Sequence, residues 1–180
     1  MEQDDNLIDH LEMEVDELAI QLLAKAPLAT DLRLITIALK ISRDLERVGD
    51  EATTIARRAV DLNNEPQLKA YVDIPRMATM AGEMLNTALD AFVQRDSTKA
   101  RNVIPRDKDV DALNKQLHRE LASFMIEQPA TITRCLNLMV ISKCIERIAD
   151  HATNIAEEVV FLYEARDIRH GGIATDSLEN

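Results

Sequence analysis

The chain has 180 residues, of which 46% are hydrophobic but only 3% aromatic, and it contains four glycines and five prolines. Sandwiches and barrels of many strands need frequent Gly/Pro turns and favour aromatic side chains, so this composition argues against them and for long helices. The net charge of −11 opposes binding to nucleic acid or to anionic lipid. No secretory signal or membrane-spanning run is present in the sequence, so we expect a soluble, cytoplasmic protein without direct membrane insertion.

Apolar residues recur every three or four positions in the first half of the chain, as amphipathic helices require. The first predicted helix covers residues 4–25 and ends before Pro27, because the residue preceding a proline disfavours helical geometry. The second covers residues 30–62, with Thr30 as its expected N-cap.

The second half of the chain predicts three more helices. The third runs over residues 75–94. The fourth covers residues 97–127 behind a cap at Asp96, and Pro105 is expected to kink or break it. The fifth covers residues 132–163, and residues 166–180 show no periodicity and are expected to form a flexible tail.

An internal repeat organises these helices. Over residues 41–60, ten of twenty positions carry the same residue 100 positions later. We therefore predict an all-α fold of two tandem three-helix-bundle repeats, residues 1–65 and 66–165. The first copy is reduced to two helices, because the chain begins where its first helix would already have finished.

Each copy also carries two pairs of acids spaced four residues apart, which places both members of a pair on one helical face. The pairs are Asp5 with Asp9, Glu46 with Asp50, Asp107 with Asp111, and Glu146 with Asp150. In an antiparallel hairpin, residues equidistant from the turn lie side by side. The pairs of the first copy share the midpoint 27.5, beside Pro27, and those of the second share 128.5, beside Pro129. Each hairpin is thus predicted to gather four carboxylates at one height.

Four gathered carboxylates favour a bound cation. Oxygen ligands without a required His or Cys indicate a hard or borderline metal such as Mg²⁺, Mn²⁺, Ca²⁺ or iron. Asn154, one turn after Asp150, is a candidate additional ligand. Two alternatives remain: a solvated acidic face that binds nothing, and a carboxylate-bridged di-metal enzyme. The chain lacks the Glu-x-x-His motif of ferritin-like enzymes and has no evident base, nucleophile or substrate pocket, so we expect no catalytic activity.

Three segments resemble the PhoU family, which regulates phosphate uptake and signalling in bacteria. They are residues 27–33 (PLATDLR), 45–50 (LERVGD) and 145–157 (IERIADHATNIAE). The resemblance covers about residues 4–170 and implies two repeated three-helix bundles. It also implies that the repeated acidic motifs, here the eight acids named above, bind iron, manganese or magnesium ions.

The resemblance further implies a role. Such a protein is a non-catalytic, usually dimeric adaptor in the cytoplasm. It would link the phosphate ABC transporter, through the ATP-binding subunit, to a phosphate-responsive sensor histidine kinase, and hold the starvation response off when phosphate is plentiful. Family members usually have one further helix before the position of Asp5, so a first bundle of two helices is expected to expose an apolar stripe.

Overall fold

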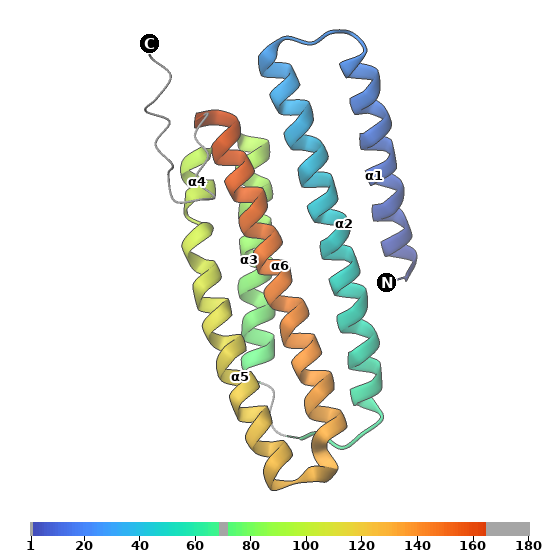
Figure 1. Cartoon of the computed structure of the whole chain (residues 1–180), viewed down its shortest axis with the longest axis vertical. Coiled ribbons are helices and arrows are strands. Elements are labelled where there is room, and N and C mark those ends of the chain that lie inside the picture. Colours follow the sequence, from blue (N-terminus) through green and yellow to red (C-terminus); the bar gives the residue numbers. More distant parts are fainter. Residues whose placement is uncertain (1, 69–71, 165–180) are drawn as a thin grey trace, which may run out of the picture.

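The computed structural model describes residues 2–68 and 72–164, with side chains from residue 6 onward in those ranges. Within them the chain is helical and contains no strand (Figure 1). The helices are α1 (Glu2–Leu23), α2 (Ala29–Asn63), α3 (Asp73–Gln94), α4 (Ser97–Arg101), α5 (Asp107–Glu127) and α6 (Ile132–Glu164), with short 3₁₀ helices η1 (Ile104–Arg106) and η2 (Pro129–Thr131). All-α architecture is confirmed.

The helix boundaries agree with the sequence predictions, with one exception among the caps. Pro105 lies in η1, where the backbone leaves α-helical geometry between α4 and α5. The Asp96 carboxylate accepts a hydrogen bond from the backbone N–H of Lys99 at 2.9 Å and caps α4. The prediction of Thr30 as the N-cap of this helix is wrong. Helix α2 begins at Ala29, so Leu28 occupies the N-cap position, and its side chain offers no hydrogen-bond acceptor. The predicted tail at 166–180 lies outside the described residues.

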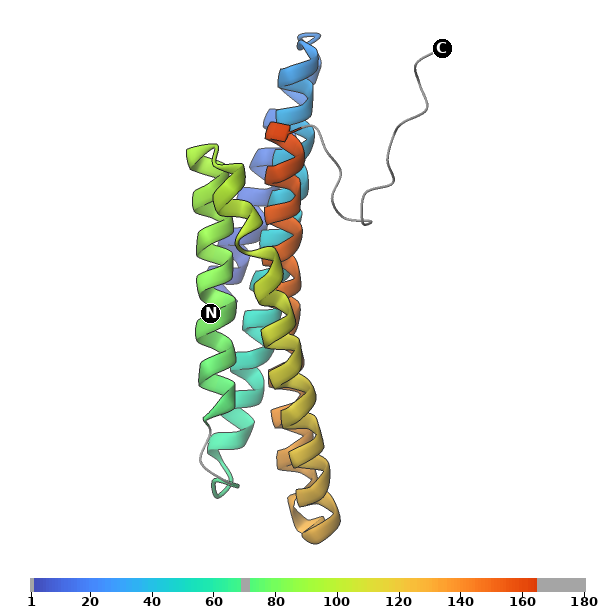
Figure 2. The same ribbon diagram turned by 90° about the vertical axis from the view of Figure 1, so that its left-hand side faces the viewer.

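Helices α2 and α6 run antiparallel along the centre of the molecule and pack extensively on each other (Figures 1 and 2). Helices α3, α4 and α5 cover other sides of α6, whereas α1 packs principally on α2. Residues 1–65, the first predicted repeat, contain α1 and α2, and residues 66–165 contain α3 to α6. The two groups of helices share a core through α2 and α6.

Small side chains fill much of this core. Ala88 and Ala91 of α3 and Ala149, Ala152 and Ala156 of α6 are fully buried. Because an alanine adds only one methyl group to the helix surface, α3 and α6 approach closely, and longer side chains such as Met77 and Met84 fill the remaining space. The packing explains how a chain nearly without aromatic residues builds a core.

The two cysteines, Cys135 and Cys144, are buried free thiols. Burial, followed by a hydrogen bond to Glu51, raises the pKa of the Cys144 thiol to about 12. That thiol therefore stays protonated.

An apolar groove of about 480 Å³ lies between α1, α2 and α3. Its walls include Leu11 and Val15 of α1, Ile41 and Leu45 of α2, and Phe92 of α3. This groove is the apolar stripe that a two-helix first copy was expected to expose. None of the described helices combines the length and apolarity needed to span a bilayer.

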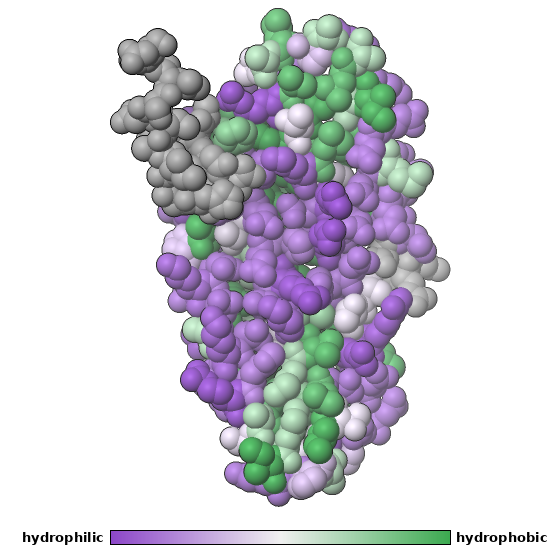
Figure 3. All heavy atoms as spheres, viewed as in Figure 1, coloured by the Kyte–Doolittle hydropathy of each residue, from purple (hydrophilic) through white to green (hydrophobic). Residues whose placement is uncertain are grey.

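Further apolar surface gathers near the α1–α2 turn and near the opposite end of the molecule, with a hydrophilic band between them (Figure 3). Exposed residues near the turn are Leu18, Ile20, Leu22, Leu23, Leu28, Leu32 and Leu34. The sites described below lie on the polar parts of α1, α2, α5 and α6.

Candidate metal centre

The acids of the second copy meet between α5 and α6. Asp107 and Asp111 lie in the first two turns of α5, and Glu146 and Asp150 lie midway along α6. The carboxylates of the two helices are close enough to perturb one another's ionisation. The alignment predicted from their shared distance to Pro129 is therefore confirmed.

In this group of four acids, the α5–α6 quartet, ionisation of Asp107 and Asp150 is disfavoured. Burial raises the pKa of Asp150 to about 6, and the negative charges of Glu146 and Asp107 add to the rise. Burial also raises the pKa of Asp107, with further contributions from Asp111 and Glu146. Removing water from a carboxylate and placing like charges beside it both destabilise the ionised form. The carboxylates of the quartet thus repel one another, and a bound cation would offset that repulsion.

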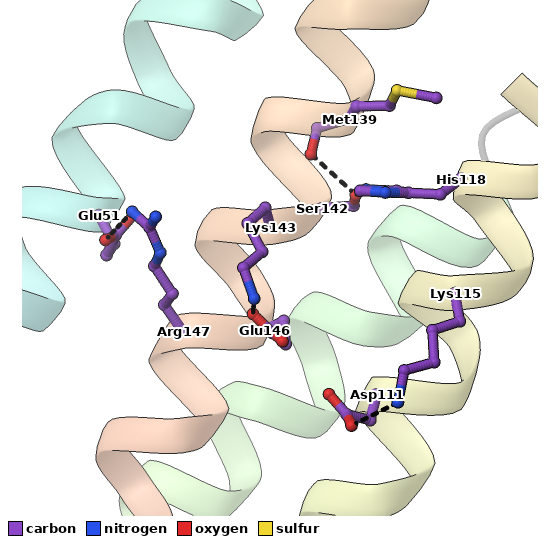
Figure 4. A network of polar contacts seen from close by, with 9 residues as sticks. All are labelled: Glu51, Asp111, Lys115, His118, Met139, Ser142, Lys143, Glu146 and Arg147. Carbon is purple, nitrogen blue, oxygen red and sulfur yellow. Dashed lines mark hydrogen bonds and ion pairs between the residues drawn. The ribbon is translucent and has the colours of Figure 1, made fainter. Parts of the chain in front are cut away.

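Two lysines supply part of the missing positive charge. Lys115 Nζ lies 2.9 Å from Asp111 Oδ2, one turn away on α5 (Figure 4). On α6, Lys143 pairs with Glu146 across one turn (Figure 4). Asp107 and Asp150 form no such ion pair among the described residues. For all four acids to bind one metal ion, Asp111 and Glu146 would have to break their ion pairs with Lys115 and Lys143.

The donor chemistry of the quartet fits a hard cation. Asp107 Oδ1 is buried and has no hydrogen-bond partner among the described residues, which leaves an oxygen available for a ligand bond. All four side chains are carboxylates, the donors that Mg²⁺, Mn²⁺ and iron accept. As it stands, however, no group of three or more His, Cys, Asp or Glu side chains in the described ranges is arranged to hold an ion. The acids are gathered, and coordination would need side-chain rotation.

The acids of the first copy are more exposed. Asp9 and Asp50 lie at the surface, Glu46 is half-buried, and the side chain of Asp5 falls outside the described residues. Burial is the main cause that raises the pKa of Glu46, and Asp50, Glu12 and Asp9 raise it further. Glu12 was missed in the sequence, although it follows Asp9 by three residues on the same helix.

Asn154 does not lie with the four acids of α5 and α6. It lines a cavity between α6 and α2, together with Lys40, Arg43, Asp44, Arg47 and Glu158. The structure thus places this candidate ligand on the α2 side of α6.

Several polar contacts join α2 to α6 and were not predicted from the sequence. Lys40 of α2 pairs with Glu158 of α6 at 2.9 Å. Asp44 Oδ1 lies 2.8 Å from His151 Nδ1, and the Arg147 guanidinium donates to Glu51 at 3.0 Å. These pairs link the two central helices of the molecule.

The comparisons with known proteins agree with this architecture. The family model described as "PhoU domain" matches residues 1–59 and 74–159. A Pseudomonas aeruginosa protein named "Phosphate-specific transport system accessory protein PhoU homolog" is 42% identical over 171 residues, which cover 94% of this chain and 71% of that relative. An Aquifex aeolicus protein of the same name is 43% identical and covers 92% of this chain and 76% of the relative.

Two solved structures share the fold. The crystal structure of PhoU from Pseudomonas aeruginosa superposes with a TM-score of 0.89 at 40% identity, covering 92% of this chain and 80% of that one. The phosphate transport system regulatory protein PhoU from Streptococcus pneumoniae gives 0.85 at 26% identity, covering 92% and 78%. The matched family model, the close relatives and the shared helical fold lead to one conclusion. This chain is a member of the PhoU family.

Proposed function

We propose that this chain is a metal-binding regulatory adaptor of phosphate uptake and phosphate-starvation signalling. One observation carries the metal-binding part: four carboxylates from two helices meet in a half-buried cluster where their own charges repel. Two acids with raised pKa values, Asp107 and Asp150, and an unpartnered buried oxygen of Asp107 are costly to a helical bundle unless the cluster binds a ligand. The α5–α6 quartet would hold iron, manganese or magnesium.

The acids of the α1–α2 hairpin form the second proposed site. They are Asp5, Asp9, Glu46 and Asp50, with Glu12 beside them. Because this group is more exposed, we expect its affinity for the same ions to be lower. A bound ion would neutralise the acids and fix their side chains. It would thereby change the charge and shape of the surface that a partner protein binds.

The names of the relatives support the regulatory part of the proposal. Two are named accessory proteins of the phosphate-specific transport system, and the Streptococcus pneumoniae structure is of a regulatory protein of phosphate transport. We propose that the chain acts in the cytoplasm as a homodimer. It would bind the ATP-binding subunit of the phosphate ABC transporter and a phosphate-responsive sensor histidine kinase, and restrain both when phosphate is plentiful. No catalytic step is part of this role.

The metal site is tested by metal content and thermal stability after loading with Mn²⁺, Mg²⁺ or Fe²⁺. The variant Glu146→Gln/Asp150→Asn removes two charges from the quartet and should lose both bound metal and the metal-induced rise in melting temperature. The matched control Asp109→Asn/Glu127→Gln removes two exposed charges from α5 and should keep both. Equal metal binding by the two variants would overturn the site.

The adaptor role needs its own experiment. The purified chain is immobilised, and the transporter's ATP-binding subunit and the cytoplasmic part of the sensor kinase are passed over it, with metal and with chelator. We expect retention of both partners, weaker with chelator. If neither partner is retained under either condition, the adaptor role is wrong even if the metal site is right.

A further inference from the structure

Polar residues on one face of α5 meet α6. Asp107, Asp111, Asn114 and His118 follow one another at steps of four, three and four residues, which places them on a single helical face. His118 Nε2 lies 3.0 Å from Ser142 Oγ, and Ser142 is fully buried on α6 (Figure 4). The polar face of α5 is therefore turned toward α6.

The contact between His118 and Ser142 also fixes which other residues lie opposite one another. Because α5 and α6 run antiparallel (Figure 1), a residue that precedes His118 faces the residue that follows Ser142 by the same number of positions. Asn114 precedes His118 by four residues, and Glu146 follows Ser142 by four. This register places Asn114 beside Glu146 of the quartet.

Asn114 is a buried amide whose oxygen makes no hydrogen bond. The residue is 7% exposed, and its Oδ1 has no partner within the described ranges. The same register sets Asp107 opposite Thr153, each eleven positions from the His118–Ser142 contact, and both also carry a buried oxygen without a partner there. A buried acceptor without a hydrogen bond destabilises the folded state unless a ligand supplies the missing interaction.

The internal repeat independently supports the placement of Asn114. The acids of α1 recur on α5 after 102 positions, and the same offset makes Glu12 the counterpart of Asn114. Glu12 lines one pocket together with Glu46, which is the counterpart of Glu146. Both copies thus place a side-chain oxygen beside this glutamate, as a carboxylate in the first copy and as an amide in the second.

We propose that Asn114 Oδ1 is a further ligand of the metal ion in the α5–α6 quartet, beside Glu146. This inference rests on the proposed metal site. An amide oxygen is a donor that hard cations accept, and it adds a ligand without adding charge. The four carboxylates already repel one another, so a neutral oxygen completes the ligand set without increasing that repulsion.

The test is isothermal titration calorimetry with Mn²⁺ as the only metal. The full chain carries Glu46→Gln/Asp50→Asn as a background, which neutralises two acids of the α1–α2 site so that binding at the quartet is measured. Asn114→Leu keeps the number of side-chain heavy atoms and removes the oxygen. It should weaken Mn²⁺ binding by about tenfold or more, the usual effect of removing a residue that holds or orients a metal.

The melting temperature without metal separates a ligand from a residue that only supports the fold. Asn114→Leu should leave this temperature unchanged or raise it, because the variant removes a buried acceptor without a partner. A structural residue would lower it together with the Mn²⁺ affinity. Asn114→Asp reproduces the carboxylate of the first copy. It should bind Mn²⁺ at least as tightly as asparagine does, and its added like charge should lower the melting temperature without metal.

Asn137→Leu is the matched control. Asn137 is 9% exposed on α6, and its Oδ1 accepts a hydrogen bond from Arg58 of α2 at 3.4 Å. The variant makes the same change at a similarly buried asparagine on the α2 side of α6. Its Mn²⁺ affinity should stay within about twofold of the background chain, because the two sites are independent.

Circular dichroism establishes that each variant is folded, and Asn114→Ala takes the place of Asn114→Leu if the leucine variant is not. Three results would overturn the inference and leave the metal site standing: unchanged Mn²⁺ affinity in Asn114→Leu, an equal loss in Asn137→Leu, or binding by Asn114→Asp as weak as by Asn114→Leu. If the background chain itself binds no Mn²⁺, the α5–α6 metal site is wrong, and this inference is wrong with it.

Discussion

Lys40 of α2 donates to both carboxylate oxygens of Glu158 on α6, at 2.9 and 3.1 Å. Glu158 is only 5% exposed, so its charge is held between the central helices of the two repeats. Removing the lysine from such a pair leaves a buried charge uncompensated. This loss destabilises the folded state by more than the intact ion pair stabilises it.

Replacing Lys40 by Met should therefore lower the free energy of unfolding by about 1–3 kcal/mol. The lysine is half-exposed, which keeps the cost below that of a fully buried pair. Urea denaturation followed by circular dichroism measures the change. Lys108→Met removes an exposed lysine from α5 and should alter stability by less than about 0.5 kcal/mol. Equal losses from the two variants would mean that the ion pair contributes nothing.

Asp150→Asn should stabilise the metal-free protein at pH 7. The pKa of Asp150 is raised to about 6 in the folded state, so folding disfavours its ionised form. The folded state therefore loses stability as pH rises from about 4 to about 6, and above that range the penalty is complete. Removing the charge should recover on the order of 1–2 kcal/mol after allowance for solvent screening. Melting temperature should rise by about 2–8 °C.

The pH profile is the control for this effect. At pH 4 the carboxyl is protonated in the folded state, and Asp150→Asn should have little effect on the melting temperature. A stabilisation of equal size at pH 4 and pH 7 would show that the charge is not its cause. The same variant should reduce the stabilisation by added Mn²⁺ if the quartet holds that ion.

Met84→Ala should destabilise the shared core. Met84 is fully buried in the core shared by the helices, so truncation leaves a cavity as well as losing apolar contact. The expected cost is about 2–4 kcal/mol in urea denaturation. Met13 is 69% exposed, and Met13→Ala should have almost no effect. A similar cost at both positions would contradict the core described above.

Ala26→Gly should stabilise the α1–α2 turn. Ala26 has a φ of 51°, in the left-handed region where the Cβ atom is crowded and glycine is not. After subtraction of the extra freedom of glycine in the unfolded chain, the expected gain is about 0.5 kcal/mol. Ala29→Gly, in the first turn of α2, should instead lower stability. Thermal unfolding measures both changes, and a loss at Ala26 would refute the left-handed turn.

The sequence predicted the parts of the fold in which neighbours along the chain are also neighbours in space. Spacing of apolar residues located the helices, and Pro105 located the break between α4 and α5. The α5–α6 quartet could be predicted because a short turn fixes which residues of two helices lie side by side. The equivalent argument for α1 and α2 placed Asp9 near Glu46, as the pKa of Glu46 reflects.

Contacts between α2 and α6 could not be predicted in this way. Their register is set by side-chain packing, since α3 and α5 intervene in the chain. The pairs Asp44–His151 and Arg147–Glu51 depend on that register. Asn154 shows a related difficulty: a step of four residues turns about 40° past a full helical turn, so two such steps from Glu146 rotate the side chain by about 80°. It consequently lies on the α2 side.

The unequal packing of α1 and α6 implies that the helices do not unfold in a single step. Among the described residues of α1, only Ala19 is buried, whereas α6 contributes buried positions along its whole length and packs on α2, α3, α4 and α5. Amide protons of α1 should therefore exchange with solvent through local fluctuations, and those in the middle of α6 only through global unfolding. The outer helix can separate from α2 while the other helices stay packed around α6, which makes the α1 edge the natural place for regulated opening.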